Sequence, residues 1–169
     1  MKARLATPSD AASIAKIYNQ GIEDRTATFE TRFRNTTDVL VWFDEIHPIV
    51  IVEEGTETLA FAATSSYRPR VCYAGIAEVS VYVDRECRGR GAGRLALSEL
   101  VRAAERARFW KLLSRVFPEN TASRALTRSL GFREVGTYEK HGCLDGVWRD
   151  VIIVELVLRS NQVVPCQLN

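Results

Sequence analysis

The chain has 169 residues, of which 46% are hydrophobic and 26% are charged, and its formal net charge at pH 7 is +2. These values are typical of one globular domain with its own core, and a nearly neutral charge gives no argument for a nucleic-acid or membrane partner. Because the apolar runs are shorter than a membrane span and the N-terminus lacks the apolar core of a signal peptide, we expect a cytoplasmic protein.

The domain is expected to cover residues 1–160, followed by a loosely ordered tail at 161–169. The cysteines are scattered along the chain without a C-x-x-C pair, at Cys72, Cys87, Cys143 and Cys166. This spacing predicts reduced thiols in place of a disulfide framework, and it predicts no metal site.

Hydrophobic periodicity divides the first half of the chain into helices and strands. We expect, in order, a strand at 2–6, a helix from 7 to at least 21, a loop at 23–35, a helix reaching 46, and strands at 49–53 and 58–66. Thr7 is the expected cap of the first helix, and Thr36 or Thr37 is the expected cap of the second. The loop contains Phe29, an apolar side chain that either packs as a plug or lines a site.

The second half of the chain continues the alternation. We expect a loop at 67–71, a central strand at 77–83, a glycine-rich loop, a helix running to 110, a buried strand at 111–117, a helix at 122–130, and long strands at 132–141 and 147–158. This order predicts an α+β domain with a mixed, mostly antiparallel sheet that is flanked by helices.

The central strand leads into Arg88-Gly89-Arg90-Gly91-Ala92-Gly93-Arg94, which an amphipathic helix follows. A strand, a glycine-rich loop and a helix N-terminus together bind anions, because the first helical N–H groups lack partners and the helix dipole is positive there. The loop is neither a Walker A motif, which needs Gly-Lys-Ser/Thr, nor a Rossmann fingerprint, because Arg94 stands where the third glycine would fall. Its arginines suit a diphosphate, and the plain alternative is a tight turn with a solvated basic helix start.

Segment Arg88–Gly93 fits the pattern Arg/Gln-x-x-Gly-x-Gly/Ala and resembles the pyrophosphate loop of the GCN5-related N-acetyltransferases. Asn120–Phe132, which starts with Asn and ends with Gly-Phe, resembles the last helix of the same family. The resemblance implies the acetyltransferase fold, with acetyl-CoA as co-substrate and its pantetheine arm along the central strand. It also implies these cofactor-binding residues: Val81, Tyr82, Val83, Arg88, Gly89, Arg90, Gly91, Ala92, Gly93, Arg94 and Asn120.

Further segments are similar to the phosphinothricin or arsinothricin N-acetyltransferase branch of that family: Thr28–Glu30, Tyr67–Arg70, Tyr73, Glu78–Val83 and Gly146–Val151. The branch also contains methionine sulfone and methionine sulfoximine acetyltransferases. The resemblance implies a homodimer that acetylates the α-amino group of a small acidic amino-acid analogue, in detoxification or resistance. It makes Phe29, Arg68, Arg70 and Tyr73 candidate substrate-binding residues, because the branch uses basic residues at positions 68 and 70 to hold phosphinate or arsinate oxygens.

Glu78 is the candidate general base, because an ammonium group must lose a proton before its nitrogen can attack. It lies on the central strand shortly before the glycine-rich loop, and it matches the catalytic glutamate of the branch. Burial is expected to raise its pKa toward a useful value, and the alternative is a surface glutamate. Thr127 stands where many relatives have a tyrosine acid, so it either orients the sulfur of the cofactor or leaves protonation to water.

Rival interpretations stay open at this point. The acceptor could be methionine sulfone, methionine sulfoximine, a polyamine, another small amine or a protein. A non-catalytic acyl-CoA-binding module is a further alternative, which the threonine at position 127 keeps open. His47 precedes a proline at a helix end and is interpreted as structural, and His141 is kept as a residue at the rim of the site, because no G-x-S-x-G elbow accompanies them.

Overall fold

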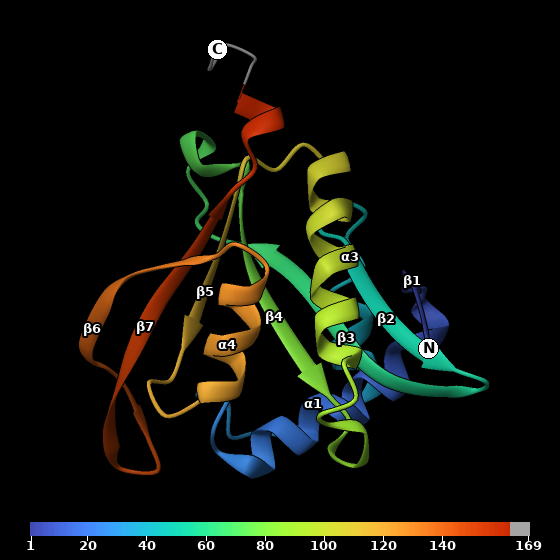
Figure 1. The fold of residues 1–169 in the computed structure, drawn as a ribbon. Helices are drawn as coiled ribbons and strands as arrows, with labels where there is room; N and C mark the ends of the chain where they lie inside the picture. The colour runs from blue at the N-terminus through green and yellow to red at the C-terminus, as the bar shows by residue number, and fades with distance from the viewer. Residues whose placement is uncertain (163–169) are drawn as a thin grey trace.

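The computed structural model describes residues 1–162 and shows a seven-stranded mixed sheet in the order β1-β2-β3-β4-β5-β7-β6 (Figure 1). The strands are β1 Lys2–Leu5, β2 Ile49–Glu54, β3 Glu57–Ser66, β4 Ile76–Val83, β5 Lys111–Val116, β6 Arg133–Leu144 and β7 Val147–Val157. The α-helices are α1 Ala11–Asp24, α2 Thr36–Leu40, α3 Ala92–Arg106 and α4 Thr121–Ser129. Short 3-10 turns lie at Pro8–Asp10, Val71–Tyr73, Arg85–Cys87 and Arg159–Gln162. The expected α+β architecture is confirmed.

The sheet is divided down its middle. Neighbouring strands are antiparallel except for β4 and β5, which pair in register from Ile76 with Lys111 to Glu78 with Leu113. Beyond Glu78, β4 continues to Val83 with β3 still beside it but without β5. Figure 1 shows these two strands diverging, with α4 in front of the widening gap. The split therefore begins at Glu78.

Both faces of the sheet are covered, which explains why the β2 residues 49–52 are all buried. Successive strand residues point to opposite faces. Val50 and Val52 accordingly belong to a core formed with α3, and Ile49 and Ile51 belong to a core formed with α1 and α2. The buried stripe of α3 supplies Ala96, Leu97, Leu100, Ala103 and Ala104 to the first core. This packing fixes the start of α3 against β4, where the glycine-rich loop lies.

The first and third α-helices differ from the expectation in their extent. Thr7 caps the first turn as expected, in a capping box with Asp10, but that turn is a 3-10 turn, and α1 then runs from Ala11 to Asp24. α3 ends at Arg106, before the predicted end, because Arg108 adopts a left-handed φ of 68° and the chain turns toward β5.

The second helix was predicted too long and with the wrong cap. Its cap is Asn35, and neither of the two following threonines takes that role. The Asn35 side chain accepts a hydrogen bond from the Asp38 N–H, and the Asp38 carboxylate accepts one from the Asn35 N–H. After five residues the helix gives way to a turn, in which the N–H groups of Trp42 and Phe43 bond to carbonyls three residues back.

The C-terminal elements follow in the predicted order. β6 runs to Leu144, past its predicted end. Asn161, expected in the loose tail, lies in the last 3-10 turn, and its side-chain amide donates a hydrogen bond to the carbonyl of Glu105 on α3. The remaining residues of the predicted tail, 163–169, lie outside the described residues.

Candidate active site

A cleft of about 810 Å³ opens where β4 and β5 part. β4 lines it from Glu78 to Tyr82, and β5 lines it from Ser114 to Val116. Residues 27–32 of the loop after α1 and the start of α4 also contribute to its walls. Because β5 no longer pairs with β4 here, main-chain N–H and C=O groups on that side of β4 lack a strand partner and can bind a thin, extended ligand.

Glu78 lies at the head of this cleft, by which we mean the end where β4 and β5 begin to separate. Its Oε2 accepts a hydrogen bond of 2.5 Å from Nη1 of Arg115, which lies on β5. The Glu78 side chain is 26% exposed and the Arg115 side chain 38% exposed. The candidate base is therefore half-buried and paired with a cation, and it remains accessible to a small molecule that enters the cleft.

Phe29 packs into the cleft wall from the loop after α1. Its ring meets that of Phe117 edge to face, with centroids 4.9 Å apart. It also lies against Gly142 on β6, where an added Cβ would stand 2.7 Å from the ring. Both expected roles of Phe29 are thus combined, since the ring is packed and also lines the cleft.

The glycine-rich loop joins β4 to α3 with two residues in the left-handed region. Gly89 has a φ of 77°, and Gly91, which caps α3, has a φ of 88°. Apart from the adjacent residues of the chain, no described atom lies within 4 Å of the Cβ position of either glycine, so their backbones are open to a ligand. Gly93, in the first turn of α3, packs closely, because its Cβ would meet Val83 at 3.0 Å. The loop thus presents the free N–H groups of a helix start next to the end of β4.

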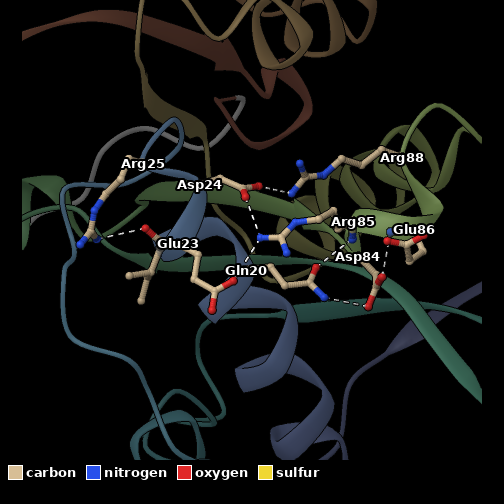
Figure 2. Close-up of polar contacts among 9 residues, drawn as sticks. Gln20, Glu23, Asp24, Arg25, Asp84, Arg85, Glu86 and Arg88 are labelled. Carbon is tan, nitrogen blue, oxygen red and sulfur yellow. Dashed lines mark hydrogen bonds and ion pairs between the residues drawn. The ribbon is translucent and has the colours of Figure 1, made fainter.

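The arginines of this loop are all engaged. Figure 2 shows the Asp24 carboxylate between Arg85 and Arg88, with hydrogen bonds of 2.7 Å and 2.6 Å. Arg90 donates to Glu54 at 2.6 Å, and Arg94 donates to a serine hydroxyl on α4 at 2.7 Å. Burial acts to raise the pKa of Asp24, but the hydrogen bonds from Arg88 and Arg85 outweigh it and hold that pKa below its ordinary value.

Asn120 and Thr127, the two α4 positions singled out through the resemblance, both line the cleft. Asn120 caps α4, since its side chain accepts from the Ser123 N–H, and it also donates to the carbonyl of Thr26 at 3.1 Å. It therefore ties α4 to the loop that carries Phe29. The Thr127 hydroxyl is buried and bonds to helix carbonyls, including that of Ser123 at 3.0 Å.

The β4 residues proposed for cofactor binding turn their side chains into the two cores. Val81 and Val83 pack against the core formed with α3. The Tyr82 ring stacks on Phe61, with centroids 5.3 Å apart, and it meets Tyr18 edge to face. Burial raises the pKa of Tyr82. What these three residues offer to a ligand in the cleft is therefore their main chain.

The predicted acid-binding residues line a separate, smaller pocket. Tyr67, Arg68, Arg70 and Tyr73 surround a volume of about 380 Å³, and the arginines are not part of the main cleft wall within the described chain. Arg68 lies over the Tyr67 ring at 5.3 Å, and the Tyr67 and Tyr73 rings meet edge to face. The two pockets adjoin along the chain, because Ser66, directly before Tyr67, lines the main cleft.

Comparison with known proteins decides the family. The model of the acetyltransferase (GNAT) family matches residues 14–132. The chain belongs to the GNAT family. It is 29% identical to the L-methionine sulfoximine/L-methionine sulfone acetyltransferase of Salmonella typhimurium, over 94% of this chain and 95% of the relative.

Solved structures of GNAT enzymes superpose on most of the chain. A phosphinothricin acetyltransferase from Sinorhizobium meliloti in complex with acetyl-CoA gives a TM-score of 0.85 at 29% identity, covering 93% of this chain and 88% of that one. A ribosomal-protein-alanine N-acetyltransferase from Brucella melitensis gives a TM-score of 0.88 at 29% identity, covering 94% and 100%. The chain is thus a GNAT-fold acetyltransferase, and its acetyl donor is acetyl-CoA.

The site fits this co-substrate. Acetyl-CoA carries a pyrophosphate and a thin pantetheine arm, and the GNAT chain offers an open helix start at Gly91 beside an unpaired stretch of β4. Within residues 1–162, no group of three or more His, Cys, Asp or Glu side chains is arranged to hold a metal ion. In the same residues, no helix is long and apolar enough to cross a membrane.

Sequence reasoning missed Arg115, and it treated His47 as structural although this residue also lines the cleft. His47 Nδ1 lies 2.6 Å from Asp44 Oδ2, and both residues line the cleft. The signal for Arg115 was a charged residue near the C-terminal end of β5, between Ser114 and Val116. His141 lies against Tyr138, with ring centroids 5.0 Å apart, on the exposed strand β6.

Proposed function

We propose that this enzyme moves the acetyl group of acetyl-CoA to the α-amino group of a small acidic amino-acid analogue such as phosphinothricin or arsinothricin, with detoxification and resistance as the outcome. The observation that carries the proposal is the position of the Glu78 carboxylate at the head of the cleft. The name of the Sinorhizobium meliloti enzyme supports phosphinothricin as acceptor. The name of the Salmonella relative supports methionine sulfoximine and methionine sulfone as second candidates.

In this proposal Glu78 is the general base. Arg115 holds its Oε2, and Oε1 has no hydrogen-bond partner among residues 1–162, so it is free to accept a proton. An ammonium group that enters the cleft gives one proton to Oε1, and the nitrogen keeps the lone pair that it needs for attack. Acetyl-CoA supplies the thioester carbonyl carbon that receives this lone pair.

Thr127 is not the acid for the departing thiolate in this proposal. Its hydroxyl is buried and donates to the α4 backbone, so its proton is already in use. A thiol with a pKa of about 8.5 forms a fair leaving group, and water can supply the proton. Thr127 then only shapes the wall against which the sulfur lies.

The glycine-rich loop and β4 hold the cofactor in this proposal. The main chain from Val81 to Val83 binds the pantetheine arm, and segment Gly89–Arg94 binds the pyrophosphate through N–H groups at the α3 N-terminus. Arg88 contributes by exchanging Asp24 for a phosphate oxygen, and Asn120 lines the same cleft from α4.

Arg68 and Arg70 bind the second acidic group of the acceptor, with Phe29 and Tyr73 as apolar walls. Support comes from the small pocket around the two arginines and from its place along the chain, since Ser66, the residue before Tyr67, lines the main cleft. Guanidinium groups suit phosphinate and arsinate oxygens because they donate two parallel hydrogen bonds.

A homodimer completes the proposal. Large apolar side chains are exposed on the β6–β7 hairpin, among them Tyr138 at 52% and Trp148 at 61%. Exposed apolar groups on one edge of a sheet favour association with a second copy. A cytoplasmic location is also part of the proposal, since Cys72, Cys87 and Cys143 are free thiols and reducing compartments keep them so.

Thiol release from acetyl-CoA with a panel of acceptors tests this function. We expect turnover with phosphinothricin or methionine sulfone, and little with spermidine or an alanine-terminated peptide. Glu78→Gln should lower kcat about a hundredfold, with partial recovery at higher pH, where more amine is already deprotonated. Glu119→Gln, at an exposed glutamate paired with Arg149, is the matched control. A Glu78→Gln enzyme as fast as the wild type at neutral pH would overturn the base assignment.

A further inference from the structure

Arg115 forms the closest charged contact of the candidate base, yet nothing in the sequence motifs gives it a role. It lies two residues beyond Leu113, the last β5 residue that pairs with β4, so it stands where the strands have begun to part. Its guanidinium faces Glu78 across the cleft at 2.5 Å. Both side chains line the cleft, and both are reached by solvent.

The other arginines that line the main cleft pair with carboxylates other than that of Glu78. Arg32 pairs with Asp38 at 3.1 Å, and Arg34 pairs with Glu30 at 2.6 Å. Among residues 1–162, the Arg115 side chain bonds to the candidate base alone. A guanidinium has five N–H donors, and this contact uses one, so most of the donors of Arg115 are free to meet a ligand.

We propose that Arg115 binds the α-carboxylate of the acceptor amino acid, an inference that rests on the proposed function. An α-amino acid carries its ammonium and carboxylate groups on one carbon. Glu78 and Arg115 present the opposite charges side by side, one hydrogen bond apart. The ammonium group therefore sits against Oε1 of Glu78 while the carboxylate meets the guanidinium of Arg115, which donates two parallel hydrogen bonds.

This arrangement divides acceptor recognition between two places. Arg115 recognises what all α-amino acids share, at the head of the main cleft. Arg68 and Arg70, in the adjoining pocket, recognise the acidic group of the side chain. Arg115 is thus a specificity-determining residue that separates α-amino acids from simple amines and from amino-acid amides. The competing interpretation is a positioning residue that only orients Glu78, and it predicts equal effects on all acceptors.

The test compares L-methionine sulfone with its α-carboxamide, which keeps the amine and the side chain but lacks the carboxylate. For the wild type, kcat/KM should favour the acid. In Arg115→Gln the ratio of the two kcat/KM values should fall at least about tenfold, through KM for the acid, because hydrogen bonds to a charged group are lost. Arg115→Lys should restore part of the ratio. Arg32→Gln, which removes another cleft arginine, should leave the ratio unchanged.

The outcomes separate the inference from the proposed function. If Arg115→Gln lowers kcat/KM for acid and carboxamide by the same factor, Arg115 only positions Glu78 and the inference is overturned. If the wild type acetylates no α-amino acid, the proposed function fails and the inference falls with it. Unchanged affinity for CoA, measured by calorimetry, shows that the variants are folded, since the exposed Arg115 side chain contributes little to the cores.

Discussion

Replacing Gly91 by aspartate and by asparagine gives a matched test of the phosphate loop. Gly91 caps α3 with a φ of 88°, and no described atom outside the adjacent residues lies within 4 Å of its Cβ position. The two new side chains have the same shape, and both residue types tolerate the left-handed region and cap helices well. The variants therefore share every steric and backbone effect and differ by one negative charge at the start of α3.

The expected magnitudes differ for stability and binding. A non-glycine residue in the left-handed region costs about 1–3 kcal/mol, with Asn and Asp at the low end, and 1 kcal/mol shifts Tm by about 2–4 °C in a domain of this size. Both variants of Gly91 should thus stay folded. A carboxylate about 5 Å from a phosphate, at an effective dielectric constant of about 20, costs about 3 kcal/mol, or more than a hundredfold in Kd. Salt screens part of this, so we expect at least a tenfold difference between the variants.

Calorimetric titration with CoA measures the difference without chemistry. It should be run at low and high salt, with thermal unfolding followed by circular dichroism. Gly91→Asp should bind CoA at least tenfold more weakly than Gly91→Asn, and added salt should reduce the difference between the two Kd values. Equal Kd values for two folded variants would refute the placement of the pyrophosphate at the α3 N-terminus.

Three further predictions follow from the same contacts. Arg70→Ala should raise KM for phosphinothricin about tenfold or more and leave KM for acetyl-CoA unchanged. If both Arg70→Ala and Arg68→Ala leave KM for phosphinothricin unchanged, the small pocket does not bind the acceptor. Trp148→Glu should convert a dimer to a monomer in light scattering, and a wild type that is monomeric at assay concentrations would contradict the dimer. The hydrogen bonds from Arg88 and Arg85 outweigh burial and hold the pKa of Asp24 below its ordinary value. The Asp24 carboxylate therefore stabilises the fold above pH about 4, and this stabilisation is lost as pH falls through the lowered pKa. The urea midpoint should fall more steeply below pH 4 in the wild type than in Asp24→Asn.

The sequence could predict what short segments encode by themselves. The glycine-rich loop was recognisable because left-handed φ values and open backbones require glycine, as Gly89 and Gly91 show. Glu78 was chosen as the candidate base from its position shortly before that loop and from its match to the catalytic glutamate of the resembled branch. The predicted cap of α2 was wrong although the correct signal was local. Asn35 and Asp38 form a reciprocal capping pair, but the threonines that follow Asn35 are also common cap residues and were chosen in its place.

Contacts between distant segments could not be predicted in the same way. Arg115 reaches Glu78 from 37 residues away, and this requires knowing that β4 and β5 are parallel neighbours that part at Glu78. Asp24 meets Arg88 across 64 residues, because α1 continues past the glycine at position 21. Nor could the sequence show that Arg68 and Arg70 surround a pocket of their own.

The parting of β4 from β5 also affects how the sheet resists aggregation. Unpaired main-chain groups on a strand invite edge-to-edge association with another chain, and most proteins carry such edges on the outside of a sheet. Here the stretch from Val79 to Val83 is an edge in the interior, with β3 on one side and the cleft on the other. A foreign strand would have to enter the cleft to pair with it. The enzyme can therefore keep unpaired main-chain hydrogen-bonding groups available for its ligand without exposing them at the outer edge of the sheet.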